Sequence, residues 1–231
     1  MGIISVEHSS NLYWLGRYVE RVYTTLGVFF DYCDVMLDKD KDQYSYRAFL
    51  EKLEIDDRYG DRESFIQGFL YGPDPFTISS AFRRAHDNAL VTRNVIGSES
   101  LAYLDLAANK FHSSRNAKNL RLEFMPVKDY LLAYWGSIDD NLMAGEAGTI
   151  IRCGKIVERM DLYFRLSRDS KFINDEFDKL CHIIDRVHRR NFCNKKHLAV
   201  LVEVLAKKDS YKERLREVLN SLNKLFEGLP A

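Results

Sequence analysis

Three charged residues lie inside a stretch whose other positions are typical of a buried helix. The stretch is NLYWLGRYVERVYTTL, residues 11–26, and the charges are Arg17, Glu20 and Arg21. A carboxylate can act as a general acid or base, and a guanidinium group presents a planar fork of donors that suits carboxylate or phosphate. The pattern therefore indicates either structural ion pairs or a site for a polar ligand.

The same pattern occurs a second time in the chain. GRYVER at 16–21 returns as GKIVER at 154–159, with Gly, Val, Glu and Arg at equal spacing. Both copies lie in segments with helical apolar periodicity, and we interpret them as a candidate internal duplication. In each copy a glycine precedes the glutamate by one turn on the same helix face. Because a glycine inside a helix costs about 1 kcal/mol relative to alanine, this placement indicates close approach of another backbone or a ligand.

The glutamate and arginine of each copy need partners from elsewhere, because adjacent residues on a helix do not face each other. Glu20 therefore cannot pair with Arg21. The same holds for Glu158 and Arg159. We hypothesise two antiparallel helices related by a pseudo-twofold axis. This arrangement would place Glu20 beside Arg159, and Glu158 beside Arg21. Two alternatives stay open: structural ion pairs, or a ligand site with Glu20 and Glu158 as candidate acid/base groups.

The elements that would position these residues are helices. Between residues 12 and 36 apolar side chains recur every three or four positions: Leu12, Leu15, Val19, Val22, Leu26, Phe29, Cys33 and Met36. Comparable patterns predict helices over 9–37, 43–55, 79–96, 99–113, 120–141, 147–168, 174–190, 195–206 and 210–227, with a helical turn at 62–70 and a break at Gly97. No segment alternates as a half-buried strand does. We predict an all-α fold: a single domain over 1–231, built as a bundle of about eight or nine helices.

Composition restricts the classes of partner. Hydrophobic residues make up 46% of the 231, which is enough for a sizeable core, and only 4 Pro and 12 Gly are present. Lys+Arg and Asp+Glu both total 34, so net charge does not favour nucleic acid or a membrane surface. The opening MGIISVEHSS does not resemble an export signal, and no run approaches the ~18 apolar residues of a membrane span. We expect a cytoplasmic protein with reduced cysteines; a homo-oligomer stays an open alternative.

Two further groups of residues are candidate sites. Cys181, Asp185 and His188 share a helix face at metal-ligand spacing, but the surrounding arginines and the absence of any E-x-x-H pair favour no metal and no cofactor. Residues 186–216 hold 10 Lys/Arg and 3 Asp/Glu. That segment could bind an acidic partner, yet no nucleic-acid-binding motif accompanies it. Gly-rich phosphate loops, G-x-S-x-G and H-E-x-x-H are all absent.

The stretch NLYWLGRYVER resembles the opening of the bacterial alpha-E family, N-L-Y-W-L-G-R-Y-x-E-R-A. DPFTISSAFRRAHDNALVTR at 74–93 is similar to the family's N-P-x-S-I and A-R-E-N-A-R-x-x-R blocks, and Ser98 and Glu99 follow. IRCGKIVERMD at 151–161 resembles its second L-G-R-x-L-E-R-A-D copy. The sequence departs from these motifs at four positions: Val22, Lys155, Ile156 and Met160. These departures weaken the expectation of a fully symmetric polar site.

The resemblance implies an all-helical domain encoded beside, or fused to, circularly permuted ATP-grasp proteins and transglutaminase-like proteins. That setting implies an accessory role in an ATP-dependent amide or peptide ligase system, in which the charged cluster organises an interface or a peptide-like ligand. The alternatives are an enzyme that uses Glu20 and Glu158, and a purely structural scaffold. The positions that the motifs imply for the cluster are Arg17, Glu20, Arg21, Asn88, Arg93, Glu99, Glu158 and Arg159.

Overall fold

The computed structural model describes residues 6–38, 46–117, 119–142, 145–186, 192–207 and 209–227. These residues form ten α-helices, a 3-10 helix and no strand, which confirms the all-α prediction. The helices are α1 (Val6–Asp38), α2 (Tyr46–Lys52), α3 (Arg62–Tyr71), α4 (Ile78–Val91), α5 (Arg93–Ser113), α6 (Leu120–Leu142), α7 (Glu146–Arg165), α8 (Ser170–Arg186), α9 (Lys195–Leu205), η2 (Ser210–Lys212) and α10 (Leu215–Asn223). No helix in these ranges is long and apolar enough to cross a lipid bilayer.

The helix count exceeds the predicted eight or nine because one turn is a complete helix. Residues 62–70 belong to α3, whose first turn is capped by Asp61: its side chain accepts a hydrogen bond from the Ser64 N–H at 2.7 Å. The predicted break at Gly97 is confirmed, since α5 bends there with a φ of 81°, which glycine adopts without steric cost. The predicted helix over 210–227 is instead η2 followed by α10.

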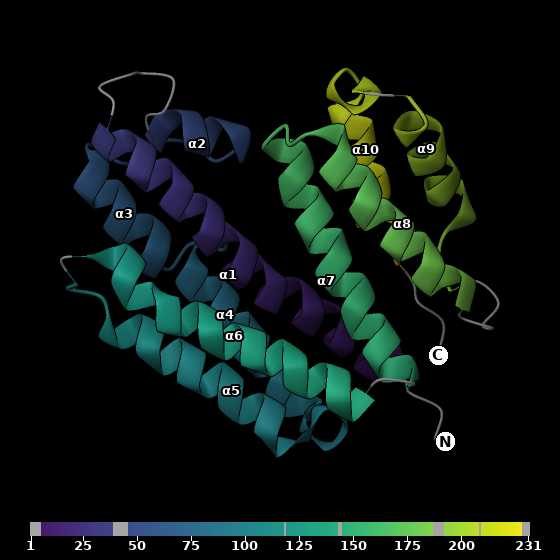
Figure 1. Cartoon of the computed structure of the whole chain (residues 1–231), viewed down its shortest axis with the longest axis horizontal. Helices are drawn as coiled ribbons and strands as arrows, with labels where there is room; N and C mark the ends of the chain where they lie inside the picture. The colour runs from purple at the N-terminus through teal and green to yellow at the C-terminus, as the bar shows by residue number, and fades with distance from the viewer. Residues whose placement is uncertain are drawn as a thin grey trace.

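Helix α1 runs through the middle of the bundle, and α7 lies along it (Figure 1). Helix α4 also packs on α1, and α5 and α6 pack on each other. On the other side of α7 lies α8, while α9 and α10 pack together at that end of the molecule. Helix α7 is therefore enclosed by α1, α8 and α10, and a polar side chain on it has protein on several sides.

The apolar ladder of α1 is buried in the core. Six of its members are fully buried: Leu12, Leu15, Val19, Val22, Leu26 and Phe29. The side chains of Cys33 and Met36 lie outside the described part of the structure. Toward the end of α1, Phe29 packs against Phe65 and Phe69 of α3 with ring centroids 5.9 and 5.8 Å apart. Ring contacts of this kind, together with the buried apolar area, stabilise the packing of α1 against α3.

Helices α1 and α7 are in close backbone contact at the two motif glycines. A Cβ on Gly16 would overlap the carbonyl oxygen of Ile151, and one on Gly154 would overlap the carbonyl oxygen of Tyr13. Ile151 follows Tyr13 by the same 138 positions that separate the glycines. The contact is therefore pseudo-symmetric, and it supports the interpretation of these two helices as an internal duplication.

The two helices are parallel, so the predicted antiparallel arrangement is wrong. Contacts keep a nearly constant offset along the chain: Gly16 meets Ile151, and Glu20 meets Arg159 further on in both helices. Figure 1 shows both helices starting at the same end of the bundle. The equal spacing of the two copies is compatible with a twofold axis perpendicular to the helices, which would make them antiparallel, or with one along the helices, which makes them parallel. In this fold α6 runs antiparallel to α7, so that α7 starts at the same end of the bundle as α1 and the axis lies along the helices.

Candidate functional site

Two reciprocal ion pairs join α1 to α7 one turn beyond the glycines. Arg159 Nε donates to Glu20 Oε1 at 2.8 Å. Arg21 Nε donates to Glu158 Oε1, and its Nη2 donates to Oε2 at 3.1 Å. The predicted pairing of each glutamate with the arginine of the other copy is therefore confirmed. We refer to these four residues and Arg17 as the Glu/Arg network.

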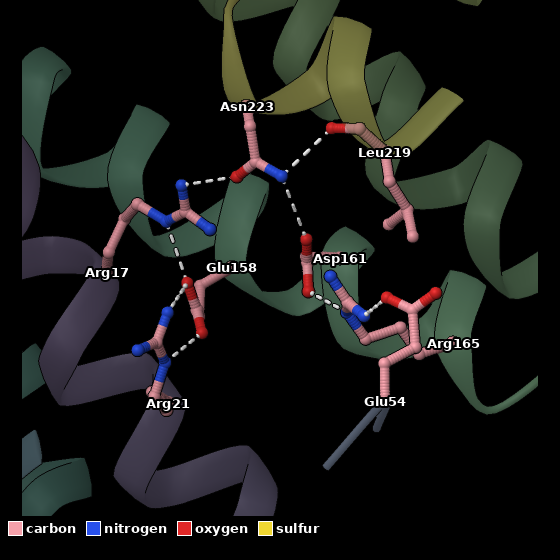
Figure 2. Close-up of polar contacts among 8 residues, drawn as sticks. All are labelled: Arg17, Arg21, Glu54, Glu158, Asp161, Arg165, Leu219 and Asn223. Carbon is pink, nitrogen blue, oxygen red and sulfur yellow. Dashed lines mark hydrogen bonds and ion pairs between the residues drawn. The ribbon is translucent and has the colours of Figure 1, made fainter. Parts of the chain in front are cut away.

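Glu158 is the centre of one half of the network, where Arg17 and Arg21 converge on it (Figure 2). Arg17 Nε donates to Oε2 at 2.7 Å, and the Glu158 and Arg17 side chains are 7% and 4% exposed. Burial alone would raise the pKa of Glu158. The charges of Arg21 and Arg17, with their hydrogen bonds, outweigh burial and lower this pKa to about 2. Glu158 therefore stays ionised across the physiological pH range.

This lowered pKa predicts a specific loss of stability in acid. The ordinary pKa of the group is 4.5, and the folded value is about 2. Its stabilising contribution is therefore complete above about pH 4.5 and is lost as the pH falls toward 2. We expect the stability difference between wild type and Glu158→Gln to narrow over that window, as measured by urea unfolding at a series of pH values. All other carboxylates are common to both proteins, so an unchanged difference down to pH 2.5 would contradict the assignment.

The other half of the network differs at one position. Lys155 occupies the place in α7 that Arg17 has in α1. Its ammonium group lies 4.0 Å from the centroid of the Trp135 ring, and no described carboxylate is within ion-pair distance of it. Glu20 is fully buried, and its Oε1 accepts hydrogen bonds from Arg159 and from the Thr24 hydroxyl. Its Oε2 has no hydrogen-bond partner among the described groups. The network is therefore asymmetric, as the departure at Lys155 predicts.

The network extends outward to the later helices. Arg17 Nη1 donates to the Asn223 side-chain oxygen on α10 at 2.7 Å, and Asn223 in turn donates to Asp161 of α7 at 3.3 Å (Figure 2). On the opposite side, Arg159 Nη1 donates to Glu176 of α8 at 3.2 Å. The buried charges therefore position α8 and α10 as well as α1 and α7.

Three residues of the predicted cluster do not join it. Asn88 donates to the Arg84 carbonyl oxygen within α4, and Arg93 donates to the Ser98 hydroxyl at 3.1 Å, while Glu99 is exposed. No described hydrogen bond or ion pair therefore joins them to the Glu/Arg network. Asn88 bonds within α4, whereas Arg93 bonds beside the α5 bend, and no described contact connects these residues to α7.

A cavity of about 470 Å³ lies against the network between α6, α7 and α8. Its wall holds five Lys/Arg, one His and two Asp/Glu residues, and we call it the cationic cavity: Asp139, Arg152, Lys155, Ile156, Arg159, Glu176, Lys179, His182, Ile183 and Arg186. A second cavity of about 430 Å³ lies among α1, α6 and α7, and Arg159 lines both. Sequence reasoning did not identify either cavity, because the linings combine helices that are far apart in the chain.

The structure describes only part of the two other candidate sites, the Cys181/Asp185/His188 group and the basic segment 186–216. Cys181 and Asp185 lie on α8, and His188 is outside the described residues. Within the described ranges no three His, Cys, Asp or Glu side chains gather as a metal site would require. In the basic segment 186–216, Arg214 is neutralised by Glu203 at 2.6 Å and by Glu217 at 2.7 Å.

These features define an all-helical protein whose central helix pair carries two Glu–Arg dipeptides joined by ion pairs. Over residues 8–225 the chain matches Alpha-E, a family described as a predicted alpha-helical domain with a conserved ER motif, and it belongs to that family. The dipeptides Glu20–Arg21 and Glu158–Arg159 agree with that description. No curated protein matches the chain, and no solved structure does.

Proposed function

We propose that this Alpha-E protein is a non-catalytic accessory subunit of an ATP-grasp amide or peptide ligase system. In this role the Glu/Arg network is an internal connection that fixes the α1–α7 pair. It also sets Arg159 in the walls of two cavities. The network is too enclosed to be a partner interface itself, so it acts through the surfaces and cavities that it positions.

The observation that carries this proposal is the enclosure of both candidate acid/base groups. General acid/base catalysis needs a group near its pKa at the working pH and within reach of substrate. Glu158 has a pKa of about 2 and both of its oxygens accept from arginines. Glu20 is fully buried. This arrangement argues against the alternative of an enzyme that uses this pair, and the cavities beside Arg159 argue against a purely structural scaffold.

Reconstitution with its partner tests the proposal. The chain is co-expressed with the circularly permuted ATP-grasp protein of the same genome, and complex formation is measured by size-exclusion chromatography with light scattering. We expect a stable complex, and amide formation that falls when the chain is omitted. Full ligase turnover without the chain, together with no complex at micromolar concentrations, would overturn it. The transglutaminase-like protein serves as a second arm of the same assay.

A further inference from the structure

The cationic cavity has the size and charge of a site for a small anion. Its volume of about 470 Å³ falls in the range of small-molecule sites, and its wall is formed by α6, α7 and α8. Its two acidic residues each form an ion pair: Asp139 Oδ1 accepts from Arg152 at 2.9 Å, and Glu176 Oε1 accepts from Lys179 at 2.7 Å, while Glu176 Oε2 has no hydrogen-bond partner among the described groups. These pairs leave an excess of positive charge on the wall, which attracts anions.

Lys155 supplies a cation that the Glu/Arg network does not use. In the other half of the network, Arg17 donates one hydrogen bond to Glu158 and another to the side-chain oxygen of Asn223 on α10. Lys155 is the pseudo-symmetric equivalent, yet it lies over the Trp135 ring and lines the cavity instead of bonding to Glu20. An ammonium group without a carboxylate partner in a partly enclosed site is available to an incoming oxyanion.

Arg159 provides a second donor group at a fixed position. Glu20 and Glu176 hold its Nε and Nη1 at 2.8 and 3.2 Å, so the guanidinium is set in place before any ligand arrives. Ile156 and Ile183 add apolar surface to the same wall. A pre-positioned guanidinium group beside an ammonium group and apolar side chains suits a ligand that combines an oxyanion with an apolar body.

We propose that the cationic cavity binds a small molecule carrying a carboxylate or phosphate group, with Lys155 and Arg159 as the oxyanion donors. This inference deepens the proposed function by naming the chemistry of the ligand. It rests on the proposed function only for the transfer of the ligand to the ligase, because binding itself is measured on the isolated chain. A ligand of this class has the carboxylate that an amide ligase activates or the phosphate that it releases.

Calorimetric titration of the isolated chain tests the site, with inorganic phosphate and the dipeptide glutamyl-glutamate as the two probes. We expect at least one probe to bind, and Lys155→Met to weaken binding by about tenfold or more, as for loss of one charge-assisted hydrogen bond. The matched control is Lys128→Met, which removes a lysine from the second cavity and leaves Lys155 in place. That control should keep the affinity of wild type.

Lys155→Arg is the second variant and separates the site from a structural effect. By analogy with Arg17, we expect the new guanidinium to reach the unpartnered Glu20 Oε2, to raise the melting temperature and to weaken anion binding. Absence of binding by both probes at 10 mM, or an equal loss in Lys128→Met, would overturn the inference. Because no ligase is present in the titration, failure of the ligase complex and failure of this site are separate results.

Discussion

Glu158→Ala should destabilise the folded protein by about 3–5 kcal/mol, the largest effect expected of any single substitution here. The carboxylate compensates the charges of Arg17 and Arg21. Arg17 is 4% exposed, so its charge would stay buried without an anion if the carboxylate were removed. Urea unfolding followed by circular dichroism at pH 7 measures the change, which should appear as a shift in midpoint with little change in slope.

The matched control is Glu203→Ala, which removes an ion pair with Arg214 at an exposed position between α9 and α10. Exposed pairs contribute little because solvent screens them, so its unfolding midpoint should be close to that of wild type. If Glu158→Ala were no more destabilising than Glu203→Ala, the network would not be the connection that holds α1 to α7. The accessory-subunit proposal would then lose its main structural support.

Gly16→Ala should destabilise the protein by about 1–3 kcal/mol, although alanine is the better helix former by about 1 kcal/mol. The new methyl group would overlap the Ile151 carbonyl oxygen and lie 3.1 Å from the Lys155 backbone nitrogen. Both are backbone atoms of α7, which cannot move aside as a flexible side chain can. The helices must separate, and the ion pairs beyond the glycines lengthen. Urea unfolding measures the loss.

Gly136→Ala is the control for helix propensity. Gly136 lies inside α6, and nothing lies within 4 Å of a Cβ placed there. The same substitution should therefore stabilise the protein by up to about 1 kcal/mol. Opposite signs for the two variants are the expected signature of a close helix contact at Gly16. A gain in stability for both would show that the α1–α7 contact tolerates a side chain.

The network and the cavities have different roles. Three arginines and two glutamates inside the bundle bind each other across α1 and α7, and Glu176 of α8 supplies the third carboxylate. The surplus cations lie outside this arrangement, on the wall formed with α8. Arg17 of α1 forms an internal ion pair with Glu158. Lys155, at the equivalent position of α7, lines the cavity wall instead.

The sequence by itself determined most of the helices, a close approach at the two glycines and the exchange of partners between the Glu–Arg dipeptides. These follow from the helical period, which fixes the residues that share a face whatever the rest of the chain does. It placed Asn88, Arg93 and Glu99 in the same cluster only through a motif resemblance, and motifs carry no distances.

Only the tertiary structure decided the parallel direction of α1 and α7, the orientation of Lys155 toward Trp135 and the existence of the cationic cavity. The direction of two helices depends on the path of the chain between them, here through α6, and not on the spacing within either copy. The cavity wall brings together residues 139, 155 and 176 from three helices. Contacts between such distant residues arise from packing, which local periodicity does not encode.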